Sequence, residues 1–319
     1  MPISRKIMGV SRGGVSKKAI FGYGNYFDGA AVTNLSTTNL VSNSGVVSTD
    51  TTGVGTARSL LAASSYGTDK AIFGYGGTGG AVSLTNLVSN IGVVSTDTTG
   101  VGTARYGSAA SSYGTDKAIF GYGMSSSGFP RTQYSVTNLV SNSGVVSTDT
   151  TGVGTARYGS AASSYGTDKA IFGYGNTSSS GGGVSVSMSN LVSNSGVVST
   201  DTTGVGTARY TLAAASYGTD KAIFGYGIDG GNNFTSVTNL VSNSGVVSTN
   251  TTGVGTARQG LAAASYGTDK AIFGYGFIGN FAGPFYNITN LISNIGVASS
   301  DTTGVGTARQ GLAASSYGT

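Results

Sequence analysis

Three features of this 319-residue sequence predict an all-β fold built from repeated antiparallel sheets. The heptapeptide Lys-Ala-Ile-Phe-Gly-Tyr-Gly occurs six times without a substitution, about every 50 residues, which is typical of a repeat architecture. Glutamate is absent, only 9% of the residues are charged, and the helix formers glutamine, lysine and leucine are scarce. Glycine contributes 55 residues, which suits short strands joined by many tight turns.

Three anchors define each repeat. The heptapeptide begins at Lys18, Lys70, Lys117, Lys169, Lys221 and Lys270. A downstream asparagine stands at Asn39, Asn86, Asn138, Asn190, Asn239 and Asn290. The arginine that ends a Gly-Val-Gly-Thr-Ala-Arg segment stands at Arg58, Arg105, Arg157, Arg209, Arg258 and Arg309. The spacing from asparagine to arginine is always 19, and from arginine to the next lysine always 12, whereas that from lysine to asparagine varies from 16 to 21. All variation in length therefore follows the second glycine of the heptapeptide.

Four strands are predicted in each repeat, and the second repeat serves as the example. They are Ser59–Tyr66, Lys70–Tyr75, Thr85–Asn90 and Val93–Thr96, with a tight turn between the first two and another between the last two. Four strands in about 50 residues is the period of a propeller blade. The sequence therefore predicts a six-bladed β-propeller of four-stranded antiparallel blades. A parallel β-solenoid is the alternative, but its coils usually have shorter periods.

The two ends of the chain predict how the ring closes. Arg309–Thr319 matches the first strand of a repeat but has no heptapeptide after it, whereas Lys6–Ser16 matches that strand poorly. We expect the C-terminal strand to pair beside Lys18–Gly24 and complete the first blade. Residues 1–14 then form a basic N-terminal arm, and residues 15–319 form one propeller. In the alternative, the N-terminal segment is itself that strand.

The net charge of +5 comes from the first 18 residues, which hold five of the basic side chains, while the rest carries 12 basic and 12 acidic residues. The arm is therefore expected to be a docking segment or a solvated tail, and nucleic acid is not an expected partner. No apolar run approaches the roughly 18 residues that span a bilayer, so no membrane span is expected. The N-terminus also has no apolar segment of the kind found in secretory signals.

The composition excludes several kinds of chemistry. Cysteine, histidine and tryptophan are absent, which removes the usual ligands of zinc, copper, haem and iron–sulfur clusters and the residues of Ser-His-Asp or Cys-His catalysis. No metal or cofactor is therefore expected. The repeated aspartates suit turn capping better than calcium loops. Asp28 and Asp229 are the only acids outside the repeated positions, each alone in a variable loop, so an enzyme is not expected.

The pattern Arg-x-x-Leu-Ala-Ala-x-Ser-Tyr-Gly-Thr-Asp-Lys-Ala-Ile-Phe-Gly-Tyr-Gly resembles the Kelch repeat. The glycine pair is split here by tyrosine, and the Kelch tryptophan is missing. The low-complexity amino-acid sequence of the repeats also resembles that of propeller repeats in virion proteins of tailed phages, particularly phages of marine cyanobacteria. The Kelch resemblance implies a propeller that binds proteins on one face. The copper chemistry of galactose-oxidase-like members needs histidine and cysteine and does not carry over.

The segments that vary in length and sequence are the main candidates for binding, because loops on a rigid scaffold commonly carry function. Their aromatic residues are Tyr26, Phe27, Phe129, Tyr134, Phe234, Phe277, Phe281, Phe285 and Tyr286. In an up-and-down blade these loops and the segments between blades share one rim, where the six arginines would form a ring able to hold an anion. The alternatives are neutral drift in the loops, and arginines that bond carbonyl groups or an aspartate of an adjacent blade.

These observations predict a non-catalytic binding or structural module. The phage resemblance implies a virion surface or tail-associated protein, which would dock to other virion proteins through its N-terminal arm. Its variable loops would recognise a host surface glycan or protein. The alternative is a cellular or secreted Kelch-type adaptor or lectin, located outside the cell or in the cytoplasm.

Overall fold

The computed structural model describes residues 16–125, 131–178, 184–279 and 283–318. The described residues contain strands and turns but no helix, and the all-β prediction is confirmed. The strands form six three-stranded antiparallel sheets and two smaller two-stranded sheets. Each three-stranded sheet contains one copy of the heptapeptide as its middle strand.

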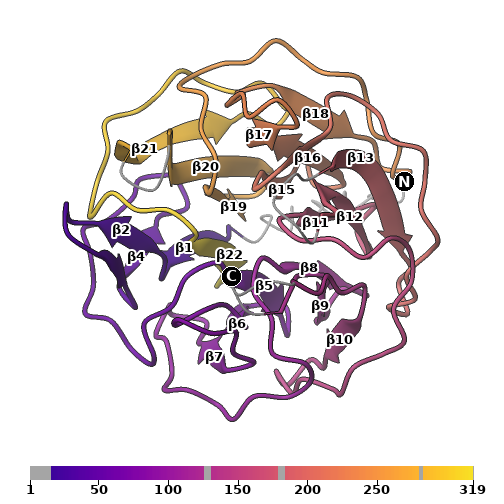
Figure 1. Ribbon diagram of the computed structural model, residues 1–319, viewed down its shortest axis with the longest axis horizontal. Coiled ribbons are helices and arrows are strands. Elements are labelled where there is room, and N and C mark those ends of the chain that lie inside the picture. Colours follow the sequence, from indigo (N-terminus) through magenta and orange to yellow (C-terminus); the bar gives the residue numbers. More distant parts are fainter. Residues whose placement is uncertain (1–15, 126–130, 179–183, 280–282, 319) are drawn as a thin grey trace, which may run out of the picture.

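The six sheets are built alike. Their first strands, nearest the centre in Figure 1, are β22 (Ala313–Tyr317), β5 (Ala62–Tyr66), β8 (Ala109–Tyr113), β11 (Ala161–Tyr165), β15 (Ala213–Tyr217) and β19 (Ala262–Tyr266). Their middle strands are β1 (Lys18–Gly22), β6 (Lys70–Gly74), β9 (Lys117–Gly121), β12 (Lys169–Asn176), β16 (Lys221–Gly225) and β20 (Lys270–Phe277). Their outer strands are β4 (Thr38–Val41), β7 (Thr85–Val88), β10 (Thr137–Val140), β13 (Ser185–Val192), β18 (Thr238–Val241) and β21 (Phe285–Ile292). The two small sheets pair β2 (Asn25–Phe27) with β3 (Val32–Asn34) and β14 (Arg209–Tyr210) with β17 (Ile228–Asp229).

The six sheets lie around a common centre (Figure 1). Their first strands together line one narrow cavity of about 80 Å³, to which each contributes two alanines. Each first strand also packs against the first strands of both neighbouring sheets, and β22 lies between β5 and β19. The small alanine side chains suit this close approach of six strands.

The two ends of the chain meet in one sheet. Strand β22 pairs antiparallel with β1, with Tyr317 opposite Lys18 and Ala313 opposite Gly22. The predicted pairing of the C-terminal strand is confirmed, since the two strands beside β1 are β22 and β4. The alternative partner, residues 6–16, lies outside the described residues except for Ser16. The predicted basic arm, residues 1–14, lies outside the described residues.

The predicted fourth strand does not form a ladder. In the second sheet the segment after β7 makes only two isolated bridges to it, Val88 with Val94 and Thr85 with Thr98. Between these bridges the Ser95 hydroxyl accepts the Leu87 N–H at 2.9 Å, while the Ser95 N–H donates to the Leu87 carbonyl at 2.8 Å. A side chain therefore replaces a backbone acceptor, which interrupts the regular pairing. Each sheet has three strands and a bridged fourth segment in place of the four strands that were predicted.

Packing between the sheets explains why the heptapeptide residues after the lysine do not vary. In β6, every residue from Ala71 to Gly74 is buried, because neighbouring sheets cover both faces of the strand. The Phe73 ring lies 5.1 Å from the Tyr23 ring of the preceding sheet, and Tyr75 meets Phe120 of the next sheet in the same way. Gly74 is also closely approached, since a Cβ built there would lie 2.7 Å from the tip of Phe120.

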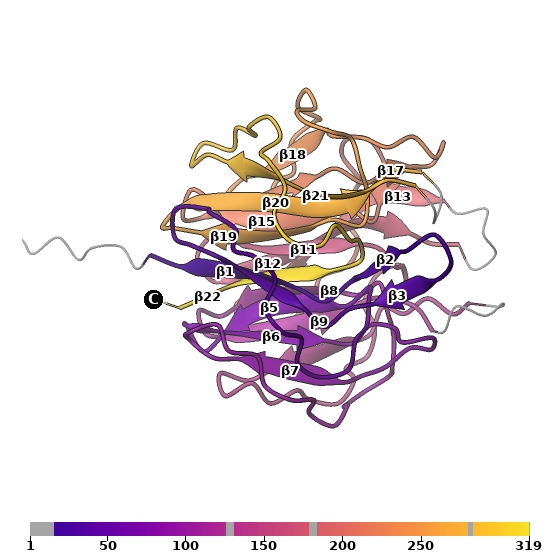
Figure 2. The ribbon, with the colours of Figure 1, turned by 90° about the vertical axis from the view of Figure 1, so that its left-hand side faces the viewer.

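The hairpins place the connections on two opposite faces. One face holds the segments after the heptapeptides, including β2, β3 and β17, and we call it the loop face (Figure 2). The other holds the short turns after the first and outer strands, such as residues 67–69 and 89–93, and we call it the turn face. Strand β1 begins and β22 ends on the turn face (Figure 2).

Candidate functional site

The residue after each arginine lies beside the residue after each heptapeptide. The bridged pairs are Ser59 with Gly77, Tyr106 with Met124, Tyr158 with Asn176, Tyr210 with Ile228, Gln259 with Phe277, and Gln310 with Asn25. The predicted shared rim of the loops and the segments between sheets is therefore confirmed. Both members of the pairs vary between repeats. The position after the arginine was not among the predicted binding residues, although the sequence shows its variation: it is serine, tyrosine or glutamine directly after a constant Gly-Val-Gly-Thr-Ala-Arg segment.

The arginines themselves point into the protein, and Arg157 illustrates all six. Its guanidinium donates to the carbonyl groups of Tyr174 at 2.8 Å and Thr155 at 3.0 Å, and to the Asn190 side chain at 2.6 Å. Asp201 lies 3.7 Å away and accepts a hydrogen bond from the Asn190 amide. The bonds to threonine and asparagine recur in every repeat. We call this group of residues the arginine cluster.

Each arginine also stacks on an aromatic ring of the preceding sheet. The guanidinium carbon of Arg157 lies 4.1 Å from the centre of the Tyr122 ring, and the other five arginines make the same contact. A cation over an aromatic face is attracted to the ring's negative quadrupole. The arginine cluster therefore joins neighbouring sheets as well as fixing the strands of its own sheet.

The six arginines are 0% exposed, so they do not form an anion-binding ring open to solvent. The alternative expectation was that the arginines bond carbonyl groups or an aspartate of an adjacent sheet, and the bonds to carbonyl groups are present. Where an aspartate is present, it comes from the same sheet and not from the adjacent one. The prediction placed these side chains on the correct rim but could not tell that they turn inward.

Burial changes the ionisation of the cluster. It raises the pKa of Tyr122 from 10.0 to about 12, because the tyrosinate would lose its hydration, although Arg157 opposes this effect. Burial also acts to raise the pKa of Asp201, but hydrogen bonds from Thr155 and Asn190 and the charge of Arg157 outweigh it. The pKa of this carboxyl therefore lies below its usual value, and the aspartate is ionised at neutral pH.

Three clusters depart from the common pattern. The Nε–H of Arg105 has no hydrogen-bond partner in the described structure, whereas the other five arginines donate it to a tyrosine carbonyl. The cluster of Arg309 joins the chain ends, because this arginine bonds Tyr23 and Asn39 and faces Asp50 at 3.7 Å. In the fifth sheet Asn250 replaces the aspartate, and among the described residues Arg209 takes part in no ion pair.

The structure brings together only some of the predicted aromatic residues. Tyr26, Phe27, Tyr134, Phe234, Phe285 and Tyr286 are half-buried on the loop face, and Phe277 is buried. Phe129 and Phe281 lie outside the described residues. Phe277 stacks on Phe285 with ring centres 5.8 Å apart.

Phe234 and Phe277 line one cavity of about 610 Å³ between the fifth and sixth sheets. Its described lining consists of Tyr210, Ile228, Asn232, Phe234, Gln259, Phe277 and Gly279. Four of these residues, Tyr210, Ile228, Gln259 and Phe277, are the members of two neighbouring bridged pairs. The cavity is therefore built where two variable pairs meet, and we call it the loop-face cavity.

Asp28 and Asp229, the two acids outside the repeated positions, each accept backbone hydrogen bonds within the turn in which they lie. Asp28 accepts the N–H groups of Ala30 and Ala31 at 2.9 Å. Asp229 accepts those of Gly231 and Asn233 at 2.8 Å. No cluster of acidic side chains suited to a metal ion occurs in the described part of the chain.

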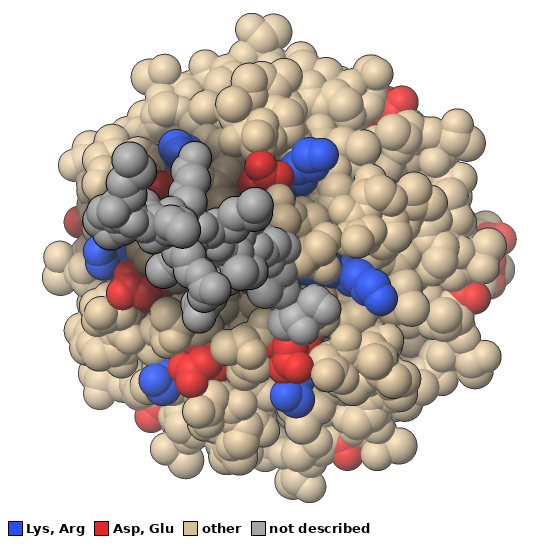
Figure 3. All heavy atoms as spheres, turned by 180° about the vertical axis from the view of Figure 1, so that it is seen from behind, with Lys and Arg blue, Asp and Glu red and all other residues tan. Residues whose placement is uncertain are grey.

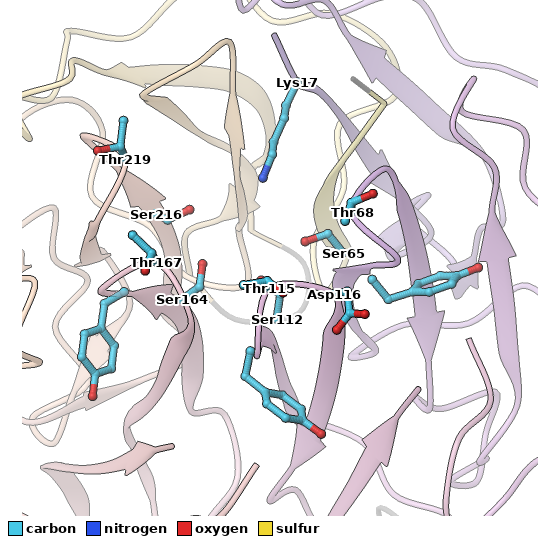
Figure 4. A pocket seen from close by; sticks show the side chains of 13 residues that line it. Lys17, Ser65, Thr68, Ser112, Thr115, Asp116, Ser164, Thr167, Ser216 and Thr219 are labelled. Carbon is cyan, nitrogen blue, oxygen red and sulfur yellow. The ribbon is translucent and has the colours of Figure 1, made fainter. Parts of the chain in front are cut away.

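The turn face has a different chemistry. Basic and acidic side chains lie near one another around it (Figure 3), as in the pair of Lys70 with Asp69 at 2.9 Å. At its centre is a cavity of about 130 Å³ into which Lys17 extends among serine and threonine hydroxyls (Figure 4). The serine and threonine residues around this cavity repeat from sheet to sheet, so the sequence of the turn face varies less than that of the loop face.

Comparison with known proteins gives no relative: no protein-family model matches the chain, and a search of curated proteins found no similar sequence. Among the described residues no helix is long and apolar enough to cross a membrane.

Proposed function

We propose that the chain is a six-bladed β-propeller that acts as a non-catalytic binding module on the surface or tail of a phage virion. In this proposal each blade consists of three paired strands and the bridged fourth segment, and β22 closes the ring beside β1. The arrangement of the six sheets around one cavity supports the closed ring. The arginine cluster of Arg309 supports it further, since it ties the C-terminal residues to those of the first repeat.

The contrast between the two faces carries the proposal of a binding function. The heptapeptide and the arginine recur in every repeat because they form the contacts between sheets. The loop face varies in length and sequence, and its variable positions lie side by side in bridged pairs. A constant scaffold that displays unlike residues on one face is the arrangement expected of a recognition surface.

The position at which the described chain begins supports docking through the turn face. The described chain begins at residue 16 and enters β1 on the turn face, away from the variable loops (Figure 2). An N-terminal arm that anchors the protein to other virion proteins would therefore leave the loop face directed outward. The virion setting itself rests on the resemblance of the repeats to those of phage proteins.

A loop replacement in the phage tests this function. The segment of residues 277–289 is replaced by the shorter sequence of residues 77–85, which already connects the same strands in the second repeat. We expect particles to assemble with the variant protein and to adsorb to host cells at least about tenfold more weakly. Labelled antibody against the chain locates it on the particles.

Two results would contradict the proposal. Absence of the chain from purified particles would remove the virion function and favour the cellular or secreted adaptor or lectin. Unchanged adsorption by particles that carry the variant would show that this part of the loop face does not recognise the host.

A further inference from the structure

The loop-face cavity is lined by aromatic, aliphatic and amide side chains. Tyr210, Phe234, Phe277 and Ile228 provide apolar surface, while Asn232 and Gln259 provide amide donors and acceptors. None of its described lining residues is charged. Ligand sites typically enclose about 300 to 1,000 Å³ and combine apolar walls with a few polar groups, and the volume of about 610 Å³ falls in this range.

The scaffold holds the walls of this cavity in place. Phe277 is 6% exposed and stacks on Phe285, with an angle of 20° between the rings. The Tyr210 ring packs edge-on against Tyr158, with ring centres 6.1 Å apart. Walls fixed before binding reduce the entropy that a ligand must overcome.

The polar groups are also positioned. The Thr211 hydroxyl lies 2.8 Å from the Gln259 side-chain oxygen and 2.7 Å from the Tyr210 carbonyl, so it holds the Gln259 side chain close to the backbone of the neighbouring sheet. Asn232 stands at the tip of its loop with a backbone φ of 61°, a conformation that asparagine tolerates better than most residues. Phe234, two residues later, forms a bridge with Ile228, which holds its loop against the two-stranded sheet of β14 and β17.

We propose that the loop-face cavity binds an uncharged pyranose of a glycan. A pyranose ring presents C–H groups on its faces, which pack against aromatic rings, and hydroxyl groups on its edge, which bond amides. The absence of charge from the described lining disfavours sialic and uronic acids, because nothing there would compensate a buried carboxylate. This inference rests on the proposed recognition function and assigns one ligand class to one site.

Saturation-transfer NMR on the full chain with single sugars tests this assignment. The probes are the methyl pyranosides of glucose, galactose, mannose and N-acetylglucosamine, with N-acetylneuraminic acid as the charged comparison. We expect at least one neutral glycoside to receive saturation and the acid to receive none. The Phe234→Ala and Gln259→Leu variants should each weaken that binding by about tenfold.

The matched control is Tyr134→Ala, which removes a half-buried aromatic side chain from the same face but outside the cavity. It should bind the glycoside as the unchanged protein does. Melting curves of all three variants identify any loss of affinity that comes from unfolding.

The outcomes separate this inference from the proposed function. Failure of every neutral glycoside to bind, or binding that survives both cavity variants, overturns the sugar site. If particles with replaced loops also adsorb poorly, the recognition function stands and its target is a protein surface. If a glycoside binds but the chain is absent from virions, the sugar site stands and the virion function fails.

Discussion

The arginine clusters and the loop-face cavity lie on the same rim of the molecule but respond differently to sequence change. Each cluster consists of residues that are nearly identical in six copies, because the arginine is buried and depends on the same threonine and asparagine partners in every sheet. The cavity is lined at positions that vary between repeats, and Tyr210, Ile228, Gln259 and Phe277 are held there by backbone pairing that does not depend on side-chain identity. Constant buried clusters beside variable pairs explain how residues on the loop face can change while the fold stays the same.

The largest effect is expected from removing residues 309–319. This deletion takes away β22, the partner of β1, and also the Arg309 cluster that joins the chain ends. We expect the melting temperature to fall by more than about 10 °C, or the cooperative transition to disappear. Circular dichroism during heating measures it. Deletion of residues 1–14 is the control, and equal melting of both truncated proteins would refute closure by the C-terminal strand.

A single buried arginine should have the next largest effect. Replacing Arg157 with methionine leaves the Asn190 side chain and two carbonyl groups without a buried donor. The cost should be about 3 to 5 kcal/mol of unfolding free energy, measured by urea denaturation. Lys117→Met removes an exposed lysine 3.6 Å from Asp116 and should cost much less. Similar losses in the two variants would show that burial does not distinguish the clusters from the surface.

Two glycines test the same contrast without a change of charge. Gly74→Ala places a Cβ 2.7 Å from Phe120 at a contact between sheets. It should destabilise the protein by about 1 to 3 kcal/mol. Gly80→Ala adds a methyl group in a variable loop where no atom lies within 4 Å. This variant should unfold at the same urea concentration as the original, and a larger loss from Gly80 than from Gly74 would reverse the assignment of scaffold and loop.

The smallest expected effect is a gain. Asn250→Asp restores the carboxylate that faces the arginine in the other five clusters, after a rotation of the Thr207 hydroxyl from acceptor to donor. At pH 7 it should stabilise the protein by about 0.5 to 1 kcal/mol. The pKa values of the five existing cluster aspartates are lowered in the folded state, so their contribution is present above the unfolded value of 3.8 and is lost as the pH falls through the folded values.

The added carboxylate should follow the same dependence on pH. Urea denaturation of Asn250→Asp and of the original protein at neutral and acidic pH measures the difference. A gain that persists in acid would show that shape, and not charge, is responsible.

The sequence by itself determined the number of the sheets and the strand that pairs beside Lys18. Six identical heptapeptides must occupy equivalent places, and the unmatched strand at the C-terminus had one open partner, beside Lys18. Constant and variable segments could also be separated by their spacing alone. These features were predictable because strand pairing and turns depend on residues close in the chain, repeated six times.

Only the tertiary structure decided what the side chains do. The arginines turn inward because Asn190 and its counterparts offer acceptors there, about 30 residues away in five sheets and 270 residues away for Arg309 and Asn39. The fourth segments lose their ladder because a serine hydroxyl replaces a backbone group. Phe234 and Phe277 meet Tyr210 and Gln259 in one cavity because neighbouring sheets bring separate repeats together. Such contacts join residues distant in the chain, and no local pattern records them.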